Sequence, residues 1–172
     1  NSMILTSRPA DAKAQFSIRP RSDGFFDIYS LTAGNVYGEL SAFSEVKPLN
    51  NHVFMVRWSW SKDFSILVFD PNNPRAMPIV NGPYANSQIV ETRGDFVLIA
   101  DGNNKLTLVD IKNNTKDIDR TFHISASGDY YISYTSDDGT VERVDSRGAR
   151  TPIGQYIKSY YRLFVEYVLV DF

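Results

Sequence analysis

The chain contains few of the residue types that usually perform catalysis. His52 and His123 are its only histidines. His123 lies in the segment FHISAS beside Ser125 and Ser127, and a histidine next to a serine hydroxyl can activate that hydroxyl as a nucleophile. A strand histidine that faces a neighbouring strand produces the same pattern, and we favour this simpler interpretation. No GxSxG, HExxH, Walker or GxGxxG motif accompanies these residues.

Acidic turns are the next candidates for chemistry. They occur at residues 70–73, 101–104 and 137–139, and their oxygen atoms suit calcium. None has the DxDxDG order followed by a glutamate, and hairpin turns prefer the same Asp, Asn and Gly residues. We therefore predict that Asp70, Asp110 and Asp145 cap turns through hydrogen bonds to backbone amides. No metal or other cofactor is predicted.

Trp58 and Trp60 form the most prominent aromatic pair. They end an alternating run, His52-Phe54-Val56-Trp58-Trp60, which is typical of one face of a strand. Two indoles on one face could stack against a sugar ring. Because Phe54 and Val56 share that face, we instead expect both tryptophans to belong to the core. Whether two of the 20 acidic residues form a glycosidase pair depends on their separation in space.

The composition is that of a globular protein with extensive β-structure. The 172 residues are 42% hydrophobic and 22% charged, and the aromatic residues, at 13%, favour pleated surfaces over helices. A net charge of −2 disfavours nucleic acid as a partner, because it offers no basic face. The absence of cysteine excludes disulfides and zinc–thiolate sites. No apolar run is long enough to predict membrane insertion.

An internal repeat organises the second half of the chain. The segments that begin at Ser87 and Thr121 share a short strand, a Gly-Asp turn, an aromatic-led strand and a further turn. They also share a strand that ends on Asp and a closing Ile. The matching positions are Gly94 and Gly128, Asp110 and Asp145, and Ile118 and Ile153. This register predicts two copies of one supersecondary unit.

Looser copies extend the repeat toward the N-terminus. The segment from Val46 keeps an Asp at a strand end, Asp70, and a closing Ile79, whereas the segment from Gln15 keeps only the turn glycine and the aromatic-led strand. The C-terminal YVLVDF echoes LTLVDI. We predict an N-terminal extension with a cloning remnant over residues 1–14 and a single β-repeat domain over 15–172. Its approximate units are 15–45, 46–86, 87–120, 121–154 and a partial 155–172.

The third and fourth units resemble the strand and turn pattern of many β-propeller families, although they lack the Trp-Asp dipeptide and the kelch double glycine. The resemblance implies an all-β, propeller-like fold with about four short repeats of four strands. The C-terminal strand would then complete the N-terminal sheet and close the ring. An antiparallel β-sandwich or barrel is the alternative.

The sequence favours a non-enzymatic, protein-binding module, specifically a bacterial inhibitor or immunity protein that blocks a toxin or hydrolase through its loops. The alternatives are a carbohydrate-binding protein or glycoside-active enzyme with an axial pocket, and a scaffold domain of a larger protein. The partner is expected to be another protein, in the bacterial periplasm or cytoplasm. The predicted partner-binding residues are Lys62, Asp63, Tyr84, Asn86, Asn103, Asn104, Asp137 and Asp138.

Overall fold

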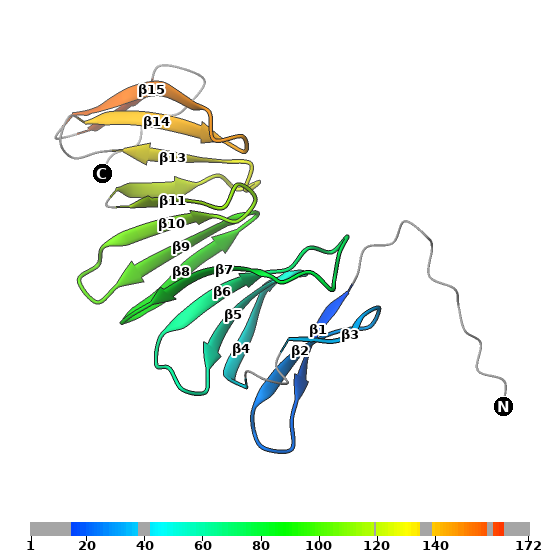
Figure 1. The fold of residues 1–172 in the computed structure, drawn as a ribbon. Coiled ribbons are helices and arrows are strands. Elements are labelled where there is room, and N and C mark those ends of the chain that lie inside the picture. The colour runs from blue at the N-terminus through cyan, green and yellow to red at the C-terminus, as the bar shows by residue number, and fades with distance from the viewer. Residues whose placement is uncertain (1–14, 38–41, 119, 135–138, 158–159, 164–172) are drawn as a thin grey trace. The chain divides into compact units, whose positions relative to one another are not determined.

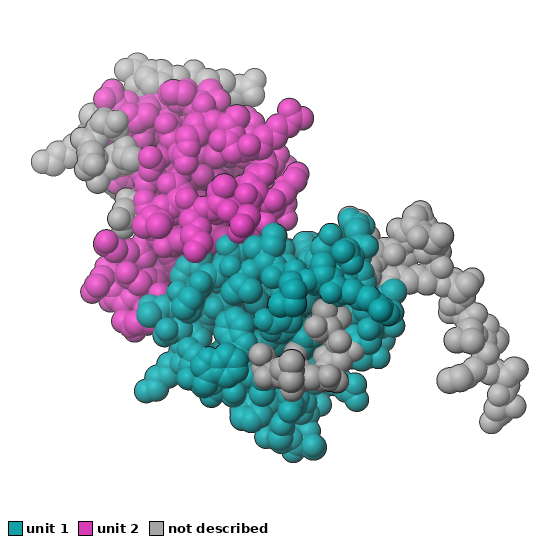
Figure 2. All heavy atoms as spheres, in the orientation of Figure 1, with its two compact units in different colours: residues 1–85 teal, residues 86–172 magenta. Residues whose placement is uncertain are grey.

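A computed structural model describes residues 15–37, 42–118, 120–134, 139–157 and 160–163. The described chain folds into antiparallel strands in three sheets and contains no helix (Figure 1). It divides into two compact units, Asn1–Ala85 and Asn86–Phe172 (Figure 2). The prediction of an all-β fold is confirmed.

The first unit contains one sheet, here sheet A. Its strand order is β1-β2-β4-β5-β6-β7, and β3 pairs with β2. Its strands are β1 (Phe16–Pro20), β2 (Phe26–Ser30), β3 (Gly34–Tyr37), β4 (Phe43–Asn50), β5 (Val53–Trp58), β6 (Phe64–Val68) and β7 (Ile79–Tyr84). Phe26 pairs with Phe43 and thereby joins the N-terminal hairpin to the strands that follow. The repeat predicts two separate four-strand sheets here, and this one pairing joins their strands into a single sheet.

An aromatic core covers one face of sheet A. Its buried residues are Ile28, Phe43, Phe54, Val56, Leu67 and Phe69. The rings of Phe16 and Phe69 stack with centroids 4.9 Å apart, and Phe54 meets Phe69 edge to face at 5.9 Å. Burying each such side chain contributes roughly 1.5 to 3 kcal/mol to folding. The alternation of Phe54, Val56 and Trp58 along β5 is what places these large side chains on one face.

The second unit contains sheets B and C. Sheet B has the order β11-β10-β9-β8, with β8 (Ser87–Arg93), β9 (Phe96–Asp101), β10 (Leu106–Asp110) and β11 (Thr115–Ile118). Sheet C has the order β12-β13-β14-β15-β16, with β12 (Thr121–Ile124), β13 (Tyr130–Tyr134), β14 (Thr140–Asp145), β15 (Arg150–Ile157) and β16 (Tyr160–Leu163). Sheet B therefore has the predicted four strands, and sheet C has a fifth.

Within the described residues, no strand of sheet C pairs with a strand of sheet A. The sequence predicts that the C-terminal strand YVLVDF joins the N-terminal sheet, and this prediction is not tested by the described residues. The preceding strand, β16, pairs with β15, from Gly154 opposite Leu163 to Ile157 opposite Tyr160. The chain can turn back directly onto the nearest free edge, and this local pairing costs less loop entropy than a distant one. The motif YVLVDF, residues 167–172, lies outside the described residues.

Sheets B and C pack face to face over a shared core. Phe96, Leu98 and Leu108 come from sheet B; sheet C supplies Phe122, Ile124, Tyr131 and Val144. The Tyr131 ring meets Phe96 and Phe122 edge to face, at 5.2 and 5.9 Å. The alternate residues of β9, Val97 and Ile99, are buried as well. Strand β9 is therefore buried on both of its faces.

The two Gly-Asp turns of the repeat touch through their backbones. Gly94 and Gly128 both have positive φ, +56° and +75°. A Cβ added to Gly94 would lie 2.9 Å from the Gly128 carbonyl oxygen, and one added to Gly128 would lie 2.8 Å from the Gly94 Cα. Both positions therefore require glycine, for the conformation and for the space.

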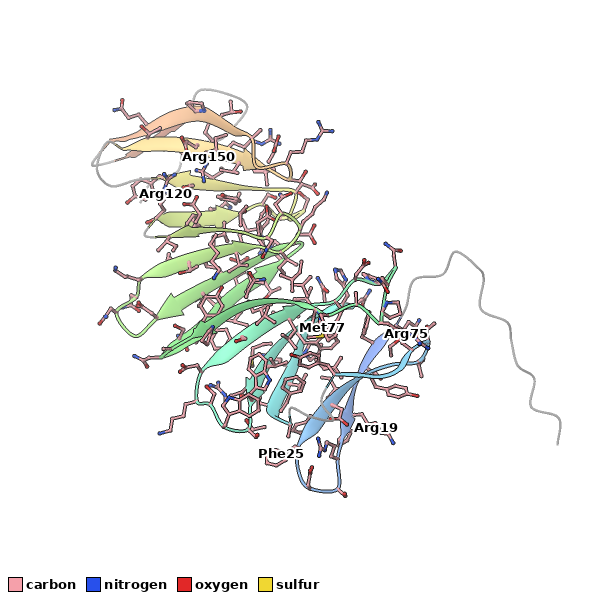
Figure 3. All side chains as sticks on the ribbon, viewed as in Figure 1. Arg19, Phe25, Arg75, Met77, Arg120 and Arg150 are labelled. Carbon is pink, nitrogen blue, oxygen red and sulfur yellow. The ribbon has the colours of Figure 1, made fainter. Side chains whose placement is uncertain are left out.

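Polar side chains reinforce the same contact. Arg93 Nη1 donates to the Ile124 carbonyl at 3.3 Å, and Asn113 Nδ2 donates to the Ser146 carbonyl at 2.7 Å. Arg150, labelled in Figure 3, pairs with Asp117 of β11 and Glu142 of β14, both at 2.8 Å. Each of these links is modest on a partly exposed surface, about 1 kcal/mol or less. Together they fix the alignment of the two sheets.

Aspartates at strand ends stabilise the turns, as predicted. Asp70 Oδ1 accepts from the Asn72 amide at 2.9 Å, and Asp110 Oδ1 accepts from the Asn113 amide at 3.1 Å. Asp145 Oδ1 accepts from the amides of Arg147 and Ala149, at 2.9 and 3.0 Å. These bonds hold the pKa of Asp145 below its usual value, because they stabilise the charged carboxylate.

We predict that Gly94→Ala lowers the free energy of unfolding by about 3 kcal/mol, since it adds a backbone clash to the cost of positive φ. Gly148→Ala is the matched control, because Gly148 has φ +81° and nothing within 4 Å of an added Cβ. Its cost should be about 1 kcal/mol. Urea denaturation measures both, and equal losses would show that the close contact contributes nothing.

The lowered pKa of Asp145 gives stability that is present above its unfolded pKa, near 4, and is lost as pH falls through the folded pKa. Asp145→Asn removes the charge and preserves the shape. It should therefore be less stable than the wild type at pH 7, and the difference should shrink toward zero by about pH 2. Urea denaturation at both pH values tests this, and a constant difference would contradict it.

Candidate functional site

The turn between β5 and β6, residues 59–63, is held by several hydrogen bonds. The Ser59 amide donates to the Ala42 carbonyl at 2.9 Å, and the Ser61 amide donates to the Trp58 carbonyl at 3.1 Å. Ser61 Oγ accepts from the Asp63 amide at 3.1 Å. The turn is thus a fixed platform at the edge of the aromatic core.

Trp60 lies on this platform and is 68% exposed. Its ring contacts that of Trp58, with centroids 6.0 Å apart and planes tilted by 31°. Trp58 is half-buried and packs on the core residue Phe43, with centroids 5.8 Å apart. The expectation that both tryptophans belong to the core is therefore wrong for Trp60. Strand β5 ends at Trp58, so the alternation stops and the turn directs the next tryptophan to solvent.

Charged side chains support the turn from the opposite face of β5. Arg57 Nε lies 3.1 Å from Glu45 Oε2 on the neighbouring strand. Arg57 Nη1 also donates to the Lys62 carbonyl. The guanidinium therefore connects β4, β5 and the turn, and it keeps the exposed Lys62 in a defined position.

Tyr84 lies next to the same turn. It pairs with Phe64, which directly follows Asp63, and the two rings are 5.3 Å apart. Burial raises the pKa of Tyr84 to about 12, because the charged phenolate would be poorly solvated there. The structure therefore brings together three predicted site residues, Lys62, Asp63 and Tyr84. The ring of Tyr84 packs on Phe64, and Trp60 offers the larger exposed aromatic surface.

Three other predicted residues gather at the β9–β10 turn of the second unit. Ser87 pairs with Asp101, which places Asn86 beside the turn that contains Asn103 and Asn104. The Asn103 amide donates to Asp101 Oδ1 at 2.8 Å, and Asn86 and Asn104 have positive φ. These asparagines therefore shape the turn itself. The predicted residues Asp137 and Asp138 lie outside the described residues.

Sequence reasoning missed Trp60, Arg57 and Glu45 as members of the site. A signal for Trp60 was available, because Trp60-Ser61-Lys62 begins a polar turn and so marks the end of the strand. The pairing of Arg57 with Glu45 was not visible, because it depends on the register between β4 and β5.

His123 and the serines that follow it make the contacts typical of a strand and of a turn. His123 is exposed on β12 and pairs with Ile132. Ser125 Oγ bonds to Ser127 Oγ at 3.3 Å and accepts from the Tyr130 amide at 3.4 Å, as expected for a turn serine. In the part of the chain that the structure describes, no three His, Cys, Asp or Glu side chains gather as metal ligands would. The same part contains no helix with the length and apolarity of a membrane span.

Comparisons with known proteins give a similarity to one repeat family and to a solved structure. The LVIVD repeat family matches residues 86–117, which include almost all of sheet B. Among solved structures, the crystal structure of BamB from Moraxella catarrhalis matches with 14% sequence identity and a TM-score of 0.29. The match covers 91% of this chain and 54% of that one, so the chain spans about half the length of BamB. No curated protein matches the chain. Residues 86–117, within the second unit, are therefore similar in sequence to an LVIVD repeat.

Proposed function

We propose that the chain is a non-enzymatic protein-binding module whose contact surface centres on Trp60 and the β5–β6 turn. The observation that carries the proposal is the exposed indole of Trp60 on a turn that is fixed from both sides. Trp58 supports the ring and Arg57 supports the backbone. Large aromatic residues are over-represented among the few residues that dominate binding between proteins.

Pre-organisation is the physical reason why this surface suits a partner. Ordering a flexible side chain or loop on binding costs free energy. The hydrogen bonds of Ser59 and Ser61 and the contact with Trp58 have already paid that cost during folding. The exposed Lys62 lies two residues after Trp60 on the same turn and supplies a charged group at the rim of the proposed contact surface.

The more specific proposal is a bacterial inhibitor or immunity protein. A rigid turn with a projecting indole has the shape that could enter the cleft of a toxin or hydrolase and block it. A pull-down from the producing organism, followed by mass spectrometry, tests this. A stoichiometric toxin or hydrolase partner would support the proposal, and a partner of another class would favour a scaffold role within a larger assembly.

We predict that Trp60→Ala weakens capture of the partner roughly 30-fold, or about 2 kcal/mol, because it removes the anchor. The matched control is Leu31→Ala, which removes a side chain of similar exposure, 69%, from another turn of the same unit. Both variants should unfold at the wild-type temperature, since both side chains face solvent. Surface plasmon resonance measures the affinities. Equal affinities for both variants would exclude Trp60 as the anchor.

A carbohydrate-binding function is the second candidate, and the exposure of Trp60 specifically favours it. An indole with one open face can stack on a sugar ring. A glycan array separates the two functions. Sugar binding that Trp60→Ala abolishes would support the carbohydrate-binding function over the protein-binding function. No binding to any sugar on the array would support the protein-binding function. A glycoside-active enzyme would in addition release reducing sugar.

The finer proposal for the fold is that sheets B and C are consecutive blades of a propeller-like array. Their face-to-face core and the contact between equivalent turns support it. An experimental structure of the whole chain would test it.

A further inference from the structure

The connection between β6 and β7, residues 69–78, is the longest in the described chain. No other connection between described strands has more than five residues. It begins with Phe69, which is 1% exposed and whose amide donates to the His52 carbonyl at 2.9 Å, and it ends with the buried Pro78. The exposed residues between these two anchors are Asn72, Asn73, Arg75 and Met77. Figure 3 labels the last two of them.

The hydrogen bonds within this connection are short-range. The Asn73 amide donates to the Asp70 carbonyl at 3.1 Å, and the Ala76 amide donates to the Asn73 carbonyl at 3.0 Å. The Asn72 amide donates to Asp70 Oδ1 at 2.9 Å. Each bond joins residues no more than three positions apart. The middle of the connection can therefore straighten without breaking the β6–β7 ladder or moving the core.

Arg75 is the only basic residue of the connection, and it is exposed. Trypsin-like serine proteases select basic side chains, because a carboxylate lies in the pocket that receives the residue before the cut bond. The residue after Arg75 is Ala76, which permits hydrolysis. Arg19 and Lys47, by contrast, directly precede prolines, which these proteases do not accept at that position.

Exposed basic residues in two other connections lie in short turns that are more tightly bonded. Lys62 belongs to the turn of residues 59–63, whose hydrogen bonds are given above. In the β14–β15 turn, Asp145 Oδ1 accepts from the amides of Arg147 and Ala149. A protease binds several residues on each side of the bond in an extended form. These turns would have to open before they could be cut, and exposed, weakly bonded loops are cut first.

A cut in the β6–β7 connection would leave the two strands in place. Their register runs from Phe64 opposite Tyr84 to Val68 opposite Ile79. The β5–β6 turn, which carries Trp60, adjoins the other end of β6. Sheet A and the proposed contact surface should therefore both survive the cut.

We propose that the Arg75–Ala76 bond is a processing site for a trypsin-like serine protease. The protease adds water across this peptide bond, which leaves a carboxylate on Arg75 and an amino group on Ala76. The product is a two-chain form, residues 1–75 and 76–172, held together by the β6–β7 ladder. The proposal goes beyond the proposed function and does not depend on it, because the contacts that carry it lie around one connection of the first unit.

Limited digestion of the whole folded chain with trypsin tests the proposal. Intact-mass measurement and N-terminal sequencing should show a new chain that begins Ala76-Met77-Pro78. The initial rate of this cut should be about tenfold or more above that of any other cut in the described residues. Size-exclusion chromatography of the product should give one peak at the position of the intact chain, which separates into two only in denaturant.

Three variants identify the residue that is recognised. Arg75→Gln should abolish the cut, and Arg75→Lys should keep it, because the protease pocket accepts either basic side chain. Lys62→Gln is the matched control, since Lys62 is an exposed basic residue of the same unit, and it should leave the rate unchanged. All three replace exposed side chains and should unfold at the wild-type temperature.

A first cut at another described residue, or a rate that Arg75→Gln leaves unchanged, would overturn the proposal. Separation of the two chains without denaturant would overturn the two-chain product. An uncut chain that inhibits trypsin would also overturn the proposal, because Arg75 would then occupy the protease pocket without hydrolysis. Partner capture that depends on Trp60 is measured separately, so the proposed function and the processing site can each fail alone.

Discussion

The contact between Gly94 and Gly128 is the constraint on which the second unit depends. Two turns at equivalent positions of the repeat approach until their backbones touch, with less than 3 Å left for any added Cβ. This distance sets how closely sheets B and C can pack. It allows Phe96 and Tyr131 to meet edge to face, and it brings Arg150 within 2.8 Å of Asp117. Packing in protein interiors is dense, so even a small displacement of the sheets would disturb all of these contacts.

In the first unit, Trp58 has the corresponding role of connecting the interior with the surface. Its ring packs on Phe43 within the core and on Trp60 outside it. The Trp58 ring, which is held by the core, thereby holds the exposed Trp60 ring in a defined position. Rigid scaffolds commonly present their binding residues on turns in this manner. The first unit therefore combines a well-packed sheet with a defined surface feature on the short turn of residues 59–63.

Much of the fold followed from local patterns in the sequence. The register of Gly94 with Gly128 and of Asp110 with Asp145 identified the units that became sheets B and C, because turn chemistry depends on neighbouring residues. The single sheet of the first unit did not follow, since it depends on one pairing between Phe26 and Phe43. The extra strand β16 was also missed as an addition to sheet C. A strand can pair with any of several free strand edges that are distant in the sequence, and the local sequence does not determine which edge it joins.

The candidate site was predicted less well than the fold. Lys62, Asp63 and Tyr84 do lie together, because the turn residues of one hairpin and the end of the next strand are neighbours in any such sheet. The position of Trp60 was missed because periodicity was continued beyond the last residue of β5. A pattern of alternation gives the face of a residue only as long as the strand lasts. The end of a strand is determined by its backbone hydrogen bonds, and the hydrophobicity of the side chains does not predict it.

The side chain of Asn113 has a consequence for covalent modification. Asn113-Asn114-Thr115 has the pattern of an N-glycosylation acceptor. A primary amide nitrogen has two hydrogens, and Asn113 Nδ2 donates to Asp110 Oδ2 and to the Ser146 carbonyl, both at 2.7 Å. A glycan would replace one of these hydrogens with a bulky sugar at the junction of two sheets. In the folded unit, Asn113 Nδ2 is therefore already used in two hydrogen bonds, and it is the same atom to which an oligosaccharide would be attached.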